Sequence, residues 1–177
     1  ASDDGAFVYA AGSNDAAVVV FSRHLTDGHL SYVARVEQGV NGADGLTGIN
    51  GLTVAKDGHS VYTLGLNQSA IGVYQRNPST GELSFQMKID QSLIGIDMSG
   101  LSAIVVSPDN QHVYVSSASQ NKLFIFGRNH TVGSPNYGEL SLIGSQSQGE
   151  HNVVGLLSPS SLNLSADGRH LYVAAEQ

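Results

Sequence analysis

Cysteine is absent from the 177-residue chain. A protein without cysteine has no disulfide framework, no thiolate metal site and no thiol nucleophile, so these three features are excluded. Charged residues are also scarce, at 13% of the chain, and fifteen acids outnumber eight lysines and arginines to give a net charge of −7. Nucleic acid is therefore not an expected partner, because phosphate backbones require a basic surface.

Long apolar runs are missing as well. No stretch approaches the roughly 20 consecutive apolar residues of a membrane-spanning helix, and residues 1–5 lack the basic and apolar parts of a secretion signal. We therefore expect no membrane insertion. An apolar period of 3.6 residues is not sustained anywhere either, so we expect no helix. The low charge and the abundance of glycine, serine and asparagine are typical of exported bacterial β-proteins, which favours an extracellular or periplasmic location.

An internal repeat is the strongest signal in the chain. A turn aspartate is followed five residues later by a tyrosine in four copies, and in three of them an arginine follows the tyrosine by fourteen positions. The spacings between turn aspartates are 53, 52 and 58, and most of the excess in the last lies in an insertion at residues 129–137. The aligned residues are Asp4, Asp57, Asp109 and Asp167; Tyr9, Tyr62, Tyr114 and Tyr172; and Arg23, Arg76 and Arg128.

Each complete copy contains four short runs of alternating apolar residues, bounded by glycine, asparagine, aspartate and proline. This pattern is typical of strands joined by tight turns. In the second copy the expected strands are residues 51–55, 60–64, 70–75 and 82–89. A four-stranded meander that recurs about every 50 residues predicts an all-β protein made of β-propeller blades.

Three segments of this repeat resemble the YVTN-type, lactonase-like seven-bladed propellers: residues 107–115 (Ser-Pro-Asp-Asn-Gln-His-Val-Tyr-Val), 126–128 (Phe-Gly-Arg) and 138–140 (Gly-Glu-Leu). The resemblance implies a seven-bladed ring. The chain accounts for about three and a quarter blades, with units at about 1–50, 51–102, 103–159 and an incomplete 160–177. We therefore expect a fragment of a propeller, whose ring is completed by further blades of the same propeller or by a second chain.

The strand order predicts that the loops between copies share one face of the propeller, called here the upper face. Three acids lie in these loops: Asp44, Asp97 and Glu150. They could hold a calcium ion, for which Asp44 and Asp97 are the candidates, or polarise a water molecule. The alternative is that they are solvated loop acids, since their distances from the next turn aspartate differ. The candidate ligand-binding rim comprises Asn41, Asp44, Asp97, Glu150, His151 and Asn152.

The repeated arginines and tyrosines are expected to serve the structure. The arginines recur in every complete blade near the lower turns, which favours structural hydrogen bonds or pairing between blades over anion capture. The tyrosines occupy a constant strand phase, which is typical of core positions. Six of the seven histidines lie near lower turns, and only His151 lies in an upper loop, so we expect His112 and its relatives to pack in turns.

Two functions remain open. One is a non-enzymatic module that binds a protein, a glycan or another ligand on the upper rim, since no nucleophile elbow, phosphate loop or zinc motif is present. The other, implied by the resemblance, is a lactonase-type hydrolase or lactonising enzyme of the 6-phosphogluconolactonase-like propellers, with Glu150 and His151 as the candidate catalytic residues. No catalytic motif of that family maps onto these residues. Apart from the candidate calcium ion at Asp44 and Asp97, no cofactor is expected.

Overall fold

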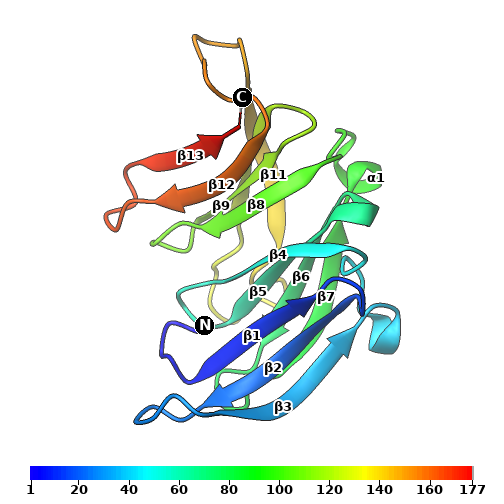
Figure 1. Cartoon of the computed structure of the whole chain (residues 1–177), viewed down its shortest axis with the longest axis vertical. Coiled ribbons are helices and arrows are strands. Elements are labelled where there is room, and N and C mark those ends of the chain that lie inside the picture. Colours follow the sequence, from blue (N-terminus) through cyan, green and yellow to red (C-terminus); the bar gives the residue numbers. More distant parts are fainter. Residues whose placement is uncertain (177) are drawn as a thin grey trace.

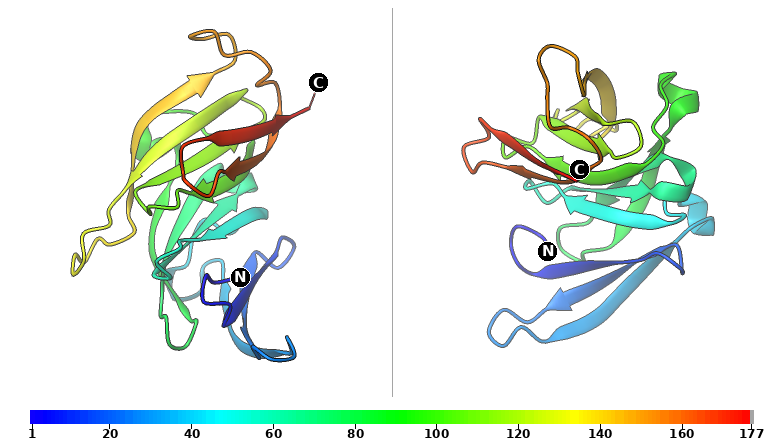
Figure 2. Two further views of the ribbon diagram at one scale, coloured as in Figure 1. Left: turned by 90° about the vertical axis from the view of Figure 1, so that its left-hand side faces the viewer. Right: turned by 45° about the horizontal axis from the view of Figure 1, so that its top comes forward.

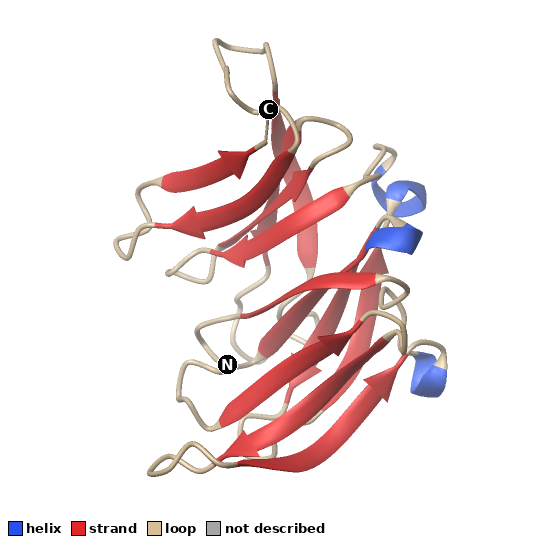
Figure 3. Cartoon of the chain, viewed as in Figure 1, coloured by secondary structure: helices blue, strands red, loops and turns tan. Residues whose placement is uncertain are grey.

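The computed structural model of the chain describes residues 1–176, and in them thirteen strands form four antiparallel sheets (Figures 1 and 3). Within each sheet the strands follow one another in chain order. We call the sheets blades 1 to 4. Blade 1 contains β1 (Phe7–Gly12), β2 (Ala17–Arg23) and β3 (Leu30–Glu37). Blade 2 contains β4 (Ile49–Val54), β5 (Ser60–Gly65), β6 (Ala70–Arg76) and β7 (Leu83–Ile89).

Blade 3 contains β8 (Leu101–Val106), β9 (His112–Ser117), β10 (Lys122–Arg128) and β11 (Leu140–Ser147). Blade 4 contains β12 (Pro159–Leu164) and β13 (Leu171–Ala175). The blades follow one another from the blue to the red end of the chain (Figure 2). This arrangement is a partial β-propeller, as the repeat predicts, and the expected strands of the second copy lie within two residues of those observed.

The first strands of blades 2, 3 and 4 lie side by side and are joined by a repeated hydrogen bond. Asn50 of β4 donates from Nδ2 to the carbonyl oxygen of Leu101 in β8 at 2.9 Å. Ser102, at the equivalent position of β8, donates from Oγ to the carbonyl oxygen of Pro159 in β12 at 2.5 Å. Both donors stand seven residues before their turn aspartate. The innermost strands are therefore fixed to one another by the same contact in consecutive blades.

The expectation of no helix is wrong in detail. The structure has one turn of α-helix, α1 (Gln91–Ile94), and two 3₁₀ turns, η1 (Val40–Gly42) and η2 (Leu66–Gln68). Asp90 caps α1 by accepting a hydrogen bond from the backbone N–H of Ser92 at 3.0 Å. A single turn is too short to show apolar periodicity, which is why the sequence pattern misses it. No described helix is long and apolar enough to cross a membrane.

The core lies between adjacent blades. One buried cluster joins blades 1 and 2, and another joins blades 2 and 3. Each side chain of this core contributes roughly 1.5 to 3 kcal/mol on full burial. The expectation that the repeated tyrosines are core residues is confirmed for Tyr9 and Tyr62. Tyr172 in β13 is instead 61% exposed, because no described sheet covers that face of blade 4.

The repeated aspartates act as turn residues. In each copy the carboxylate accepts a hydrogen bond from the backbone N–H two residues later, at 2.9 to 3.1 Å. This local bond closes the hairpin before the tyrosine-bearing strand and explains why an aspartate recurs at that place. The pairs are Asp4 with Ala6, Asp57 with His59, Asp109 with Gln111, and Asp167 with Arg169.

Candidate functional site

The upper face carries the loops between blades, in agreement with the strand-order argument. The loop between blades 1 and 2 meets the β5–β6 turn, where the backbone N–H of Thr47 donates to Oε1 of Gln68 at 3.1 Å. The loop between blades 3 and 4 meets the β9–β10 turn, where the backbone N–H of Ser158 donates to Oδ1 of Asn121 at 2.7 Å. All six candidate rim residues belong to such loops between blades.

Asp44 is a hub of hydrogen bonds. Its Oδ1 accepts from the Nε2 atoms of Gln38 at 2.8 Å and Gln68 at 2.6 Å, and from the backbone N–H of Gly45 at 2.8 Å. Its Oδ2 lies 3.0 Å from the Nζ atom of Lys88. The carboxylate therefore ties the loop between blades 1 and 2 to blade 2, and both of its oxygens are engaged with the protein.

The electrostatics of Asp44 follow from these contacts. Partial burial alone would raise the pKa of its carboxyl group, but the donors Gln38, Lys88, Gly45 and Gln68 outweigh that effect and hold the pKa well below its usual range. The hydrogen bonds that Lys88 donates to the Asp44 and Asp90 carboxylates raise the pKa of Lys88. The cluster is thus a charged structural contact at neutral pH.

Asp97 makes the equivalent contact one blade further on. Its Oδ2 accepts from Nε2 of Gln120 at 2.9 Å, and its Oδ1 from the backbone N–H of Ser99 at 2.8 Å. Gln68 and Gln120 both stand eleven residues after their turn aspartate. The two acids differ by one residue in loop position, so their equivalence was hidden in the sequence and is visible only in the folded chain.

The loop that carries Glu150 and His151 repeats the fold of the loop that carries Asn41. The backbone N–H of Leu156 donates to Oε1 of Gln148 at 2.7 Å, and that of Leu46 donates to Oε1 of Gln38 at 2.9 Å. Both loops place left-handed residues at the same two positions, which are Asn41 and Gly42 in one loop, with φ of 51° and 79°, and His151 and Asn152 in the other, with φ of 48° and 65°.

This equivalence places Glu150, His151 and Asn152 at the exposed tip of their loop. The position of Asp44 is taken there by Val154, which is 83% exposed. The side chains of Glu150 and His151 make no hydrogen bond within residues 1–176, in contrast to those of Asp44 and Asp97. The rim residues are therefore of two kinds, namely acids consumed by structural contacts and a free pair at a loop tip.

The structure does not gather the rim residues into one cluster. Asp44 and Asp97 contact different blades, and Glu150 and His151 follow the outermost strand of blade 3. Among the described residues, no three histidine, aspartate or glutamate side chains are placed to hold a metal ion. The oxygens of the calcium candidates Asp44 and Asp97 instead face glutamine amides.

On the lower face the repeated arginines bridge neighbouring blades. Arg76 of blade 2 donates from Nε to the hydroxyl of Tyr9 in blade 1 at 2.5 Å, and Arg128 of blade 3 donates to Tyr62 in blade 2 at 2.6 Å. Each tyrosine in turn donates to a glycine carbonyl of the following blade, at 2.8 to 2.9 Å. The expected pairing between blades is confirmed for these two arginines, although the sequence did not reveal which tyrosine each would bind.

The chain resembles known β-propellers in its sequence pattern and in its fold. Residues 52–177 match the family model described as lactonase, 7-bladed β-propeller. No curated protein matches the chain in sequence. Among solved structures, a protein of Bacteroides uniformis assigned as a 6-phosphogluconolactonase is 19% identical with a TM-score of 0.72, and one of Bacteroides fragilis is 19% identical with a TM-score of 0.74. The periplasmic gluconolactonase PpgL of Pseudomonas aeruginosa is 22% identical with a TM-score of 0.65.

These structural neighbours share the fold over nearly the whole chain. Each aligns with 98% of it, whereas the chain spans 48%, 46% and 41% of the respective neighbours, which is less than half of each. The family model covers well over half of the chain, including blade 3, most of blade 2 and the two strands of blade 4. The chain therefore belongs to the lactonase family of seven-bladed β-propellers.

Proposed function

We propose that the protein acts as a lactone hydrolase of the 6-phosphogluconolactonase-like type, on the upper face of the propeller. The observation that carries this proposal is the family match over residues 52–177. The neighbours assigned as 6-phosphogluconolactonases and as a gluconolactonase support the same reaction class. The substrate class is a sugar lactone, whose ring ester is opened by water to give a hydroxy acid.

The free pair at the tip of the loop between blades 3 and 4 supplies the proposed chemistry. The Glu150 carboxylate takes a proton from water as the water oxygen attacks the lactone carbonyl carbon. The tetrahedral intermediate then collapses, the ring C–O bond breaks, and the leaving alkoxide takes up a proton from His151. Asp44 and Asp97 take no part in this scheme, because their oxygens are already hydrogen-bonded to protein amides.

The proposal is tested by measuring acid release from δ-gluconolactone and from 6-phosphogluconolactone in a pH-stat. The protein should accelerate hydrolysis over the spontaneous rate, and Glu150→Gln should lower kcat by about 100-fold, the lower end of general acid–base contributions. Val40→Ala is the matched control, because Val40 stands at the position of Glu150 in the equivalent loop between blades 1 and 2. Hydrolysis that Glu150→Gln and His151→Asn leave unchanged would refute the assignment of the pair.

A binding role is the second candidate function. It is favoured by one observation, namely that the loops between blades 1 and 2 and between blades 3 and 4 share a fold but differ at their tips, with Val40 and Asn41 in one and Glu150 and His151 in the other. Variable tips on a constant loop suit recognition of a protein or a glycan. This role would be favoured over catalysis if the protein bound glycans on a glycan array and hydrolysed no lactone.

We also propose an extracellular or periplasmic location. The periplasmic neighbour from Pseudomonas aeruginosa supports it, as does the low charge of the chain. Fractionation of the native cells, with antibody detection of the protein, tests this location directly.

A further inference from the structure

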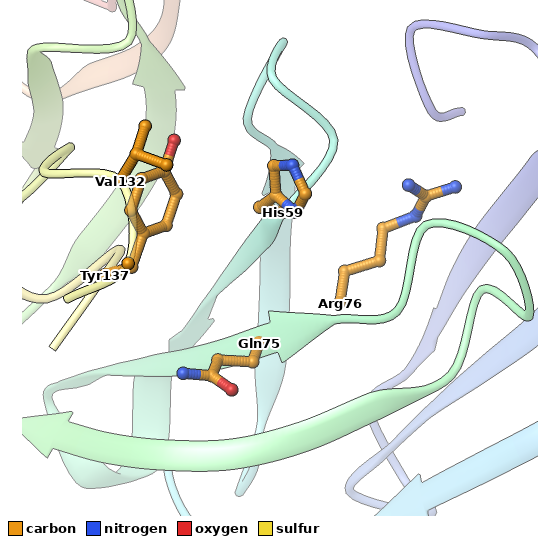
Figure 4. A pocket seen from close by; sticks show the side chains of 6 residues that line it. His59, Gln75, Arg76, Val132 and Tyr137 are labelled. Atoms are coloured by element: carbon orange, nitrogen blue, oxygen red, sulfur yellow. The ribbon is translucent and has the colours of Figure 1, made fainter. Parts of the chain in front are cut away.

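Two cavities of about 270 Å³ each lie between neighbouring blades. One lies between residues 129–137 and blade 2, where the rings of Tyr137 and His59 meet (Figure 4). The guanidinium of Arg76 turns away from this space and lies 5.1 Å from the centre of the Phe7 ring in blade 1, so its charge is not offered to a ligand there. The other, called here the outer cavity, lies between the last strands of blades 1 and 2.

Apolar side chains of the core between blades 1 and 2 line the outer cavity. Val36 comes from β3, Ala43 from the loop between the blades, and Leu83 and Phe85 from β7. Ala43 belongs to the buried cluster of blades 1 and 2, and the other three pack against that cluster. Their side chains therefore point into the space between the two blades.

The corresponding place between blades 2 and 3 carries larger side chains. Strand register shows the correspondence, because Val36 pairs with Val18 in β2 as Ile89 pairs with Ile71 in β6. Each counterpart stands 53 positions later in the chain. The counterparts of Val36, Asn41 and Ala43 are Ile89, Ile94 and Ile96. Ile89 is fully buried, and Ile94 and Ile96 pack against the core of blades 2 and 3.

The outer cavity is therefore the space that smaller side chains leave between two blades. Protein interiors are otherwise close-packed, and an unfilled space lowers stability in proportion to its volume. An apolar cavity of about 150 Å³ is enough to hold benzene, and small-molecule sites begin at roughly 300 Å³. At about 270 Å³ the outer cavity has room for a ring system somewhat larger than benzene.

The charged residues beside the outer cavity are already paired with each other. Nη2 of Arg35 lies 2.9 Å from Oε2 of Glu37. An ionised ligand would have to compete with this pair, and the net charge of −7 further disfavours an anion. The ring of Phe85 favours another aromatic ring, which can stack on it or meet it edge to face. Shape and charge therefore both suit a neutral aromatic molecule.

We propose that the outer cavity binds a free, neutral aromatic molecule of one or two fused rings. The ring of the ligand lies against Phe85 and Leu83 of blade 2 and against Val36 and Ala43, where it completes the core as the isoleucines do between blades 2 and 3. Neither Glu150 nor His151 lines the cavity, so this binding does not rest on lactone hydrolysis.

The experiment titrates the whole chain with indole by isothermal titration calorimetry and compares indole-3-acetate, which carries the same rings and a negative charge. Indole should bind at a single site. Indole-3-acetate should bind at least about tenfold more weakly, because burial of its carboxylate has no free cation to offset it.

Two variants fill the outer cavity with the side chains found between blades 2 and 3. Ala43→Ile should weaken indole binding about tenfold and raise the melting temperature of the free protein, a combination that misfolding could not produce. Val36→Ile adds less volume and should act in the same direction by about threefold, so it decides the test if Ala43→Ile does not fold. Ile96→Ala is the matched control at the next interface. It should lower the melting temperature and leave the affinity for indole unchanged.

A third variant tests the aromatic wall. Phe85→Leu installs the residue that stands at the equivalent place in β11, Leu142. It should weaken indole binding about fivefold through the loss of the ring contact. No indole binding at millimolar concentration, equal binding of indole-3-acetate, or binding that survives both filling variants would overturn the proposal. Indole binding that persists in Glu150→Gln, whatever that variant does to lactone hydrolysis, is the expected independence of the two sites.

Discussion

Arg128 in blade 3 and Tyr62 in blade 2 share a hydrogen bond of 2.6 Å, from the guanidinium Nε to the phenol oxygen, although 66 residues separate them. The Tyr62 hydroxyl in turn donates a hydrogen bond to the carbonyl oxygen of Gly138 in blade 3 at 2.8 Å. The Arg128 side chain is fully buried. The repeated arginines of blades 2 and 3 thus each fix their own blade to the preceding one.

Replacement of Arg128 by methionine should destabilise the protein by about 3 kcal/mol, because it leaves the Asp57 carboxylate and the Tyr62 hydroxyl without their buried partner. The loss is measured as a shift of the urea unfolding midpoint. Arg23→Met is the matched control, since Arg23 makes one hydrogen bond of 3.3 Å at the same position of blade 1. Equal losses for the two variants would contradict the role of the Arg128 network.

The tyrosine half of the contact gives a second prediction. Tyr62→Phe removes a hydroxyl that both donates and accepts in a buried place, so we expect a loss of about 2 kcal/mol in the free energy of unfolding. Tyr172→Phe, at the equivalent position of blade 4, should change stability by less than about 0.5 kcal/mol, because Tyr172 is exposed. Thermal unfolding followed by circular dichroism compares the two.

The low pKa of Asp44 predicts a pH dependence of stability. A carboxyl group whose folded pKa lies below its unfolded value of 3.8 contributes stability that is complete above that value and is lost as the pH falls towards the folded pKa. Asp44→Asn should therefore cost about 2 kcal/mol at pH 7, and the gap between wild type and variant should narrow below about pH 4.

Urea unfolding at pH 7 and at a pH below about 4 measures this difference in the free energy of unfolding between wild type and Asp44→Asn. Asp97→Asn serves as the comparison, because Asp97 is exposed, contacts an equivalent glutamine and has no described lysine partner. It should cost less than Asp44→Asn at neutral pH. A gap for Asp44→Asn that is constant from neutral to acidic pH would show that the charge of this carboxylate does not stabilise the fold.

Gly45 and Gly155 occupy the same place in two loops of the same fold, both with φ of 81°. Alanine at either position has an unfavourable backbone conformation, at roughly 1 to 2 kcal/mol. At Gly45 an added Cβ would also lie 2.8 Å from the Cα atom of Gly72, whereas at Gly155 it would meet nothing within 4 Å. Gly45→Ala should therefore destabilise the protein clearly more than Gly155→Ala in urea unfolding, and a similar loss for both would show that the backbone relaxes.

Much of the fold was determined locally and could be predicted from the sequence. The turn aspartates, the strand alternation and the phase of tyrosine and arginine are set by hairpin geometry within one blade, which each repeat encodes by itself. For the same reason the loops could be assigned to faces from strand order alone. The short turn α1 escaped prediction, because its stability comes from the Asp90 cap and not from an apolar period.

The site depended on tertiary structure. Whether Asp44 was a free acid or a structural hub was decided by Gln68 and Lys88, which are distant in sequence and meet it only when blade 2 is formed. A cavity of about 270 Å³ between residues 129–137 and blade 2 likewise exists only because blade 3 folds against blade 2. The sequence by itself determined the blade and its repeat, because these rest on contacts between near neighbours. Only the tertiary structure decided which polar groups remain free, because hydrogen bonds between blades join residues whose spacing carries no local signal.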